Sequence, residues 1–394
     1  MNANIDANEN MNVNANMDDP IDSDKIMNPF EAVQLPRVIN AAGKMTYLGS
    51  SAVRSEVASV MSAASQSYVD MAALKQAIQL RVAELTGAEA ACITSCAAAG
   101  IIVSIAAVLT GTDLDKVEAL PEIKGGKREV ILQKGHAVSF GANLTQMIRM
   151  TGATAKEIGT VNGVKPYHLE GAITESTAAI VYVVSHHAVS NEMLSLPEVV
   201  AIASKHHIPV IVDAAAEVDL KLYLAQGAAL AVYSGHKAIG GPTSGLIIGR
   251  QDLIDACQLQ EKGYARAMKI GKENIMGFYT AIAYYLKEDP QEMADRLKEI
   301  VEKLQADIRG CGLTGISTKI AWDATRPIPR LQLIMEENAV MTAKQLIGRL
   351  EQNNPSIRTR NHSADAGIIQ FDPRELKIEE TRIIAQVMQR IWEG

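Results

Sequence analysis

A single lysine, Lys237, stands in a loop of small residues at positions 233–245, between two short apolar runs. The runs, at 228–232 and 246–249, are typical of buried strands. A loop held between strands keeps one amine at a defined point among residues too small to shield it. A buried lysine loses its proton easily and can form a Schiff base with a carbonyl compound. From this loop alone, the alternative is a solvated lysine in a glycine turn.

A carboxylate, Asp213, ends an apolar run that Pro209 opens upstream of this lysine, and three alanines follow it. A carboxylate at the end of a buried strand is costly unless a cation meets it. The alanines, Ala215 among them, leave room for a flat ring. Asp213 and Lys237 together suit pyridoxal 5'-phosphate (PLP): the aspartate would keep the pyridine nitrogen protonated, and the lysine would bond to the aldehyde carbon.

A candidate anion site lies at residues 91–104. A short apolar strand is followed by Thr94, Ser95 and Cys96, and then by a helix of alanine and β-branched residues. Hydroxyls and free backbone N–H groups at a helix N-terminus bind anions, so this turn suits the phosphate of the cofactor. The simpler interpretation of Thr-Ser is an ordinary N-cap. The anion site, the aspartate and the lysine together are more specific than any one of them.

The segments that carry these residues resemble a known enzyme family. The similar segments are residues 38–46 (VINAAGKMT), 94–99 (TSCAAA), 213–217 (DAAAE), 234–245 (SGHK and GGPTSG) and 371–374 (FDPR). From about residue 28 onward the chain is similar to fold-type I PLP enzymes of the bacterial selenocysteine synthase group. Within that group it most resembles the D-glucosaminate-6-phosphate ammonia-lyases.

This resemblance implies further cofactor contacts. His136, just past a strand, is expected to lie over the cofactor ring as well as to serve catalysis, although a satisfied core histidine is the alternative. Asn191 is expected near the phenolic oxygen of the cofactor. Ser234 and His236 share the lysine motif, and Thr243 is a candidate for contact with the phosphate of a neighbouring subunit.

Substrate contacts are expected from a second set of residues. Arg374 is similar to the arginine that holds the substrate carboxylate in many relatives, although pairing with Asp372 or Glu375 is the alternative. His186 and His187, in a polar loop after a strand, are candidates for substrate binding or proton transfer.

Basic residues add further candidates. Lys44 lies in a glycine-punctuated arm that reaches toward an active site in the family, unless it is an ordinary surface arm. Arg266, Lys269 and Lys272 concentrate positive charge before an expected helix, which suits an anionic substrate group. Solvated surface lysines and arginines are equally consistent with this run.

The elements that must position these residues alternate between strands and helices. This alternation predicts an α/β fold: a mainly parallel, seven-stranded-type sheet with helices on both faces, and ligands at the carboxyl edge of the strands. We expect an Asn-rich disordered tail (1–28), an N-terminal arm (29–70), a large PLP-binding domain (71–288) and a small α+β domain (289–394). The expected strands are 90–94, 129–133, 178–184, 208–213, 229–233, 245–249, 315–321, 328–336 and 367–371, and the expected helices are 69–85, 196–205, 274–286, 293–309, 342–351 and 375–392.

Composition limits the class of protein. The 394 residues are 47% hydrophobic and carry a net charge of −7, and no basic run suggests a nucleic-acid partner. The four cysteines lack the spacing of a metal site. Neither a signal peptide nor an apolar stretch of membrane length is apparent, so we expect a cytoplasmic protein without a metal. The family usually builds its site between subunits, which implies a homo-oligomer, at least a dimer.

The expected reaction is removal of a proton from Cα, loss of a hydroxyl from Cβ and hydrolysis to a 2-keto acid and ammonia. The substrate implied by the resemblance is a small amino acid or a phosphorylated amino sugar acid. Alternatives are a selenocysteine synthase-like transferase acting on seryl-tRNA, another PLP reaction such as racemisation, aldol cleavage or β-substitution, and a catalytically silent relative. The short polar stretch before Pro36 and the acidic net charge argue against a tRNA substrate.

Overall fold

The structure is a computed structural model that describes residues 29–122, 124–185, 188–322 and 328–394. These residues form two compact units. The large unit contains residues 44–293. The small unit contains the described residues up to Gly43 together with Ala294–Gly394. Helix α11 (Pro290–Gly310) includes the boundary between the units.

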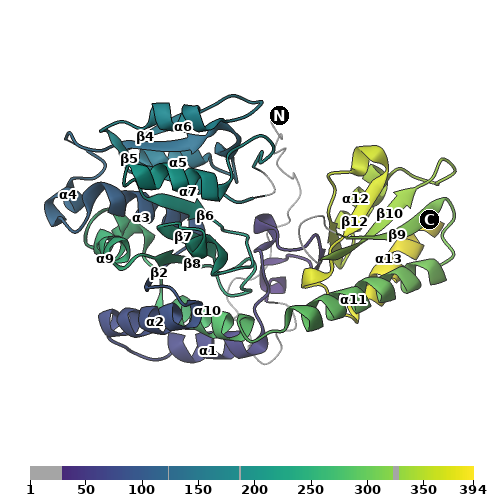
Figure 1. Ribbon diagram of the computed structural model, residues 1–394. Helices are drawn as coiled ribbons and strands as arrows, with labels where there is room; N and C mark the ends of the chain where they lie inside the picture. The colour runs from purple at the N-terminus through teal and green to yellow at the C-terminus, as the bar shows by residue number, and fades with distance from the viewer. Residues whose placement is uncertain (1–28, 123, 186–187, 323–327) are drawn as a thin grey trace. The chain divides into compact units, whose positions relative to one another are not determined.

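The large unit is built on a seven-stranded sheet in the order β2-β8-β7-β6-β5-β3-β4 (Figure 1). Strand β8 is antiparallel to both of its neighbours, and the other neighbouring pairs are parallel. The expected mainly parallel α/β sheet is therefore confirmed. Its strands are β2 (Ala90–Thr94), β3 (Glu129–Gln133), β4 (Thr154–Ile158), β5 (Thr177–Val183), β6 (Val210–Asp213), β7 (Leu230–Ser234) and β8 (Gly245–Gly249).

Helices cover both faces of this sheet because its central strands are apolar on both sides. In β7, Leu230 and Val232 belong to the core that includes α3, α5 and α9, whereas Ala231 and Tyr233 belong to the core that includes α2, α7 and α10. The helices of the large unit are α1 (Ser55–Ser65), α2 (Met71–Thr86), α3 (Ala97–Thr110), α4 (Leu114–Ala119), α5 (Leu144–Met150), α6 (Pro166–Ala172), α7 (Leu196–Lys205), α8 (Leu222–Ala225), α9 (Gln251–Leu259) and α10 (Lys272–Tyr285).

Local signals explain where several helices begin and end. The Asp70 carboxylate accepts a hydrogen bond from the Ala73 N–H and caps α2, and Gly87 ends this helix at a φ of +72°. Ser195 and Glu198 form a capping box at the start of α7. Both helices lie where the sequence predicts them.

The small unit combines two sheets with three helices in its described part. Strand β1 (Val38–Ala41) pairs in parallel with β11 (Ser356–Thr359), and the sheet β12-β10-β9 is antiparallel. Apolar residues of these strands pack with those of α11–α13 in one core. The remaining elements are β9 (Ile316–Trp322), β10 (Pro329–Met335), β12 (Ile368–Phe371), α12 (Ala343–Gln352) and α13 (Glu380–Glu393).

The structure differs from the sequence prediction at several elements. Strand β4 was not expected, because its sequence TAKEI is polar; it is an edge strand, where charged side chains protect against pairing with other chains. The last helix begins at Glu380 rather than at residue 375, because a 3-10 turn, Pro373–Glu375, comes first. Helix α10 begins at Lys272 instead of residue 274. Within the described residues, no helix combines the length and the apolar character that crossing a membrane requires.

Candidate active site

Lys237 lies in a tightly packed loop between β7 and β8. The Gly235 N–H donates to the Ser244 carbonyl oxygen at 2.9 Å, and the Gly241 N–H donates to the Gly235 carbonyl oxygen at 2.7 Å. A Cβ at Gly235 would lie 2.0 Å from the Ser244 Oγ, so only glycine fits this close approach. The Lys237 Nζ lies 6.0 Å from the centre of the Phe140 ring, at the limit of a cation–π contact. Phe140 was not anticipated from the sequence.

Asp213 ends β6 and is 3% exposed. Its Oδ1 accepts a hydrogen bond from the Ala215 N–H at 3.1 Å. Burial raises the pKa of this carboxyl to about 6, whereas the Ala215 N–H and the charge of Lys237 act in the opposite direction. Asp213 and Lys237 therefore lie within electrostatic reach of each other.

His136 follows β3 in a 3-10 turn and is almost completely buried. Its Nδ1 accepts a hydrogen bond from the Val183 N–H at 3.1 Å, and Val183 pairs with Asp213 across β5 and β6. Because Nδ1 is an acceptor, the proton of the neutral ring is on Nε2. Burial lowers the pKa of His136 to about 4. A neutral imidazole is thus held near the end of β6. It lies edge-on to the Tyr182 ring, and the centres of the two rings are 4.6 Å apart.

The turn that contains Thr94, Ser95 and Cys96 leads into α3. The Thr94 Oγ1 donates to the Cys96 carbonyl oxygen at 2.9 Å, and the Cys96 Sγ accepts from the Ala99 N–H at 3.4 Å. The N-cap of α3 is therefore Cys96. Thr94 pairs with Gly245 across β2 and β8, and a Cβ at Gly245 would lie 2.3 Å from the Cys96 carbonyl oxygen. This turn consequently packs directly against the end of the lysine loop.

The beginning of the large unit also contacts the lysine loop. The Lys44 Nζ donates to the Lys237 carbonyl oxygen at 2.6 Å and to the Ala238 carbonyl oxygen at 3.5 Å. The Ser51 Oγ donates to the His236 carbonyl oxygen at 2.7 Å. The sequence predicted Lys44 for substrate contact and gave no indication of Ser51. No local pattern identifies either side chain as a partner of residues 236–238.

Of the other residues expected to contact the cofactor, two lie in the interior beside Lys237 and two are exposed. The Ser234 N–H donates to the Ala215 carbonyl oxygen at 3.1 Å, which joins the lysine loop to the segment after Asp213. The side chains of Ser234 and His236 lie in this interior region, and burial together with the charge of Lys237 lowers the pKa of His236. Asn191 and Thr243 are exposed.

The basic residues that were expected to bind the substrate are not gathered at one point. Arg266 and Lys269 are exposed, whereas the Lys272 Nζ donates to the Ser65 carbonyl oxygen at the end of α1 at 2.8 Å. His186 and His187 lie outside the described residues. The roles of these five residues remain predictions.

Arg374 belongs to the small unit, where Asp372 binds it. The Asp372 carboxylate accepts from the Arg374 Nε at 2.9 Å and Nη2 at 2.8 Å, which is a bidentate pair. Two arginines that the sequence did not single out also approach it: the Arg330 Nε at 3.0 Å and the Arg360 Nη1 at 3.7 Å. The pairing of Arg374 with Asp372, the structural alternative, is present, and its role toward a substrate carboxylate remains a prediction.

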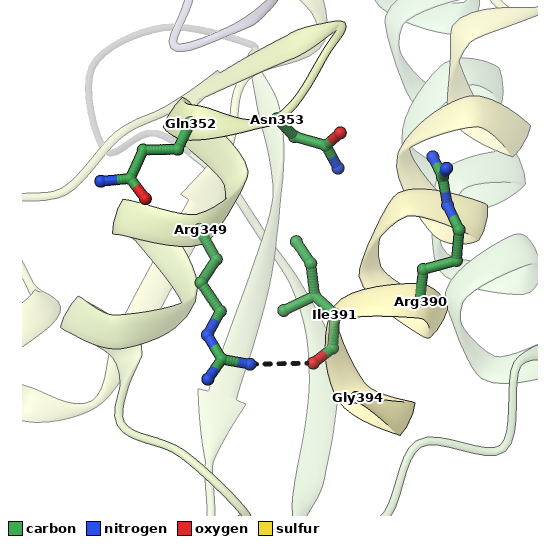
Figure 2. Close-up of a pocket in the computed structure, with 6 residues that line it drawn as sticks. All are labelled: Arg349, Gln352, Asn353, Arg390, Ile391 and Gly394. Atoms are coloured by element: carbon green, nitrogen blue, oxygen red, sulfur yellow. Dashed lines mark hydrogen bonds between the residues drawn. The ribbon is translucent and has the colours of Figure 1, made fainter.

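A separate hollow of about 340 Å³ lies in the small unit (Figure 2). The Arg349 Nη1 donates to the Ile391 carbonyl oxygen at 3.2 Å across it. It contains none of the residues expected to carry chemistry, so we do not assign the reaction to it. Its lining residues are Arg349, Gln352, Asn353, Arg390, Ile391 and Gly394.

The residues of the large unit fit PLP. A buried carboxylate and a lysine lie at the same edge of the sheet, as the ring nitrogen and the aldehyde of this cofactor require. The Ser234 Oγ and the His236 Nδ1 are buried without a hydrogen-bond partner among the described residues. Buried polar atoms normally have partners, so a polar ligand beside Lys237 would complete them.

Comparison with known proteins agrees with this arrangement. The L-seryl-tRNA selenium transferase (SelA) family model matches residues 38–309. A D-glucosaminate-6-phosphate ammonia lyase from Salmonella typhimurium is 38% identical over 93% of this chain and 98% of its own length. A 5'-C-glycyluridine monooxygenase-decarboxylase from a Streptomyces species is also 38% identical, over 90% of this chain and 89% of its own.

Solved structures extend the comparison. A structure of D-glucosaminate-6-phosphate ammonia-lyase matches with a TM-score of 0.87 and 38% identity, over 93% of this chain and 98% of that one. A serine palmitoyltransferase structure with bound PLP, from S. paucimobilis, shares the fold alone, at a TM-score of 0.54, 12% identity and coverage of 90% and 87%. The predicted family and fold are thereby confirmed: this chain belongs to the SelA family of fold-type I PLP enzymes.

Proposed function

We propose that this protein is a PLP-dependent lyase that releases ammonia from a 2-amino acid carrying a hydroxyl group on the next carbon. The preferred substrate class is a phosphorylated 2-amino sugar acid, and the product is a 2-keto acid. The observation that carries the proposal is the 38% identity with D-glucosaminate-6-phosphate ammonia lyase over nearly the full length of both chains. The buried Asp213 and the nearby Lys237 support it chemically.

Bound PLP supplies an aldehyde that condenses with amines and a ring that accepts the electron pair left when Cα loses its proton. Lys237 would hold the aldehyde carbon and, once displaced by the amine of the substrate, take the Cα proton. Asp213 would keep the ring nitrogen protonated. Its pKa of about 6, which already includes the charge of Lys237, means that it is ionised at neutral pH, and a protonated ring nitrogen beside it would lower that pKa further.

The remaining residues of the large unit would hold and orient the cofactor. His136 is buried and neutral, so its ring offers a flat face and an Nε2–H donor without adding charge. Thr94, Ser95 and Cys96, at the N-terminus of α3, would bind the phosphate group. The Ser234 Oγ and the His236 Nδ1 have no hydrogen-bond partner among the described residues, and each would bond to a polar group of the cofactor.

Substrate anions require basic partners. Arg374 presents a guanidinium fixed by Asp372, which suits a carboxylate. Arg266, Lys269 and Lys272 remain our candidates for the distant phosphate. Loss of the Cα proton and the Cβ hydroxyl releases water, and hydrolysis of the C–N bond takes one water up. The net reaction therefore converts the amino acid to one 2-keto acid and one ammonia.

A second candidate function is the oxidative chemistry named for the Streptomyces relative, because its identity with this chain is equally high. The lyase is favoured because the match covers 98% of the Salmonella protein but 89% of the Streptomyces protein. A transferase acting on seryl-tRNA is less favoured, since an L-seryl-tRNA(Sec) selenium transferase from Aquifex aeolicus is only 24% identical over 91% of this chain.

The test is a substrate screen with the purified chain and added PLP. Phosphorylated 2-amino sugar acids, D- and L-serine and threonine are incubated with and without dioxygen, and ammonia and 2-keto acid are quantified. Oxygen-independent release of both products in equal amounts supports the lyase, whereas release of CO₂ that requires dioxygen supports the second candidate. The Lys237→Ala variant should lose the borohydride-sensitive absorbance band and the activity. The control variant Lys205→Ala, at an exposed lysine paired with Glu170, should retain both.

A further inference from the structure

The segment that opens the large unit, residues 44–51, holds the main chain of the reactive lysine. Three consecutive carbonyl groups, those of residues 236, 237 and 238, accept hydrogen bonds from the side chains of Lys44 and Ser51 in this segment. Ser51 donates to the carbonyl oxygens of residues 236 and 237, at 2.7 and 3.4 Å. Lys44 donates to those of residues 237 and 238, at 2.6 and 3.5 Å. The contacts are centred on the peptide that carries the Lys237 side chain.

Main-chain bonds within the loop also reach this peptide, but at 3.2 and 3.4 Å they are longer than the shortest bonds from Lys44 and Ser51, which measure 2.6 and 2.7 Å. The bonds within the loop join its two ends, from the Gly235 N–H to the Ser244 carbonyl and from the Gly241 N–H to the Gly235 carbonyl. At the middle of the loop, the Gly240 N–H donates to the Lys237 carbonyl at 3.2 Å and closes one turn, and the Lys237 N–H donates to the Ser234 carbonyl at 3.4 Å. Lys44 and Ser51 supply the additional bonds that fix this turn from outside.

The backbone conformation of the segment directs these side chains toward the lysine loop. Gly49 and Ser50 have φ angles of +83° and +66°, and the Ser50 N–H donates to the Met45 carbonyl oxygen at 3.0 Å. A left-handed conformation is costly for serine, and such backbone strain tends to occur where function requires it. Ser50 is buried, and the tight turn that it completes places Ser51 against the lysine loop.

We propose that Ser51 and Lys44 are positioning residues, which act through the main chain of residues 236–238 to fix the origin of the Lys237 side chain. This inference rests on the proposed function, because it assumes that Lys237 is the amine that binds PLP. The two side chains would keep that amine in one place before PLP arrives and whenever the substrate displaces it. Such preorganisation avoids ordering the loop during each reaction.

The first test needs no cofactor. Hydrogen exchange of the Gly240 and Gly241 amides is compared in the full chain and in variants at positions 51 and 44. Ser51→Ala should exchange about 2- to 12-fold faster, as expected for loss of one neutral hydrogen bond. Lys44→Met should accelerate exchange about 10-fold or more, because its donor is charged. Ser51→Thr and Lys44→Arg should restore slow exchange. Ser67→Ala, which removes an exposed hydroxyl-to-carbonyl bond of 2.9 Å, is the matched control.

The second test adds PLP and follows formation of the borohydride-sensitive absorbance band. Ser51→Ala and Lys44→Met should form it more slowly by similar factors, and the two conservative variants should approach the parent rate. Unchanged amide exchange, failure of Ser51→Thr and Lys44→Arg to restore it, or a general loss of folding in Ser51→Ala would overturn the positioning role. If the parent chain forms no band, the proposed function fails, whereas the exchange comparison still decides whether the segment holds the loop.

Discussion

Replacing Asp213 with asparagine is expected to stabilise the large unit when PLP is absent. Burial raises the pKa of this carboxyl from its usual 3.8 to about 6, so the folded chain holds the proton more tightly than the unfolded chain does. Stability is therefore lost as the pH rises from 3.8 through about 6. One pKa unit corresponds to about 1.4 kcal/mol. The ionised carboxylate thus costs about 3 kcal/mol at pH 8, a penalty that an uncharged amide of the same shape does not carry.

The assay is thermal unfolding of the PLP-free chain, followed by circular dichroism. For a unit of this size, 1 kcal/mol shifts Tm by about 2–4 °C, so Asp213→Asn should raise Tm by about 6–12 °C at pH 8. The advantage should fall to about 2 kcal/mol at pH 5 and below about 1 kcal/mol at pH 4, where the parent carboxyl is protonated. Asp252→Asn is the control: Asp252 pairs with Arg250 at the surface, and its pKa is lowered, so its replacement should not stabilise the chain at pH 8.

With PLP added, the parent should become more stable than Asp213→Asn. The carboxylate of the parent would then face a protonated ring nitrogen, whereas the amide of Asp213→Asn would lack the charge. The parent should therefore gain more stability from PLP and bind it more tightly. The reasoning is refuted if Asp213→Asn is no more stable than the parent at pH 8 without PLP. It is equally refuted if the difference between the two is the same at pH 4 and pH 8.

Three other changes follow from the geometry of the site. Gly245→Ala should cost about 1–3 kcal/mol and weaken PLP binding, because its Cβ would lie 2.3 Å from a main-chain oxygen; melting curves and PLP titration measure this, and Gly171→Ala, with open space around it, is the control. His136→Ala should release PLP faster than His136→Phe, which keeps a flat ring, and equal release rates would argue against ring contact. Asp372→Asn should destabilise the small unit by about 3–5 kcal/mol, because guanidinium groups lose their buried carboxylate. Tryptophan fluorescence reports this loss, since both tryptophans of the chain lie in the small unit, and an unchanged denaturation midpoint would contradict it.

Much of the large unit was predictable because its strands are continuous apolar runs with small or polar residues at their ends. The expected run 178–184 corresponds to β5, and the expected strand 245–249 is β8 itself. The order of strands also places Asp213, His136 and the lysine loop at one edge of the sheet. The polar strand β4 escaped prediction, because an edge strand does not need apolar residues on both faces.

The finer geometry of the site was not predictable because it depends on contacts between distant segments. Ser51 bonds to a carbonyl 185 residues further along the chain, and no local pattern marks a serine for that role. Cys96 caps α3, although serine and threonine are the usual caps and both precede it. The convergence of Arg330 and Arg360 on Asp372 likewise appears only once β10, β11 and β12 are brought together.

The pairing of β1 with β11 has a consequence for how the protein is made. Val38 and Ser356 are partners in this two-stranded sheet, so one strand leaves the ribosome long before the other. At about 5–20 residues per second, β1 waits roughly 15–60 s for its partner. During that interval its Ile39, fully buried in the finished protein, is without its final neighbours. A nascent chain stalled before residue 356 should therefore be a better chaperone substrate than one in which β11 has also emerged.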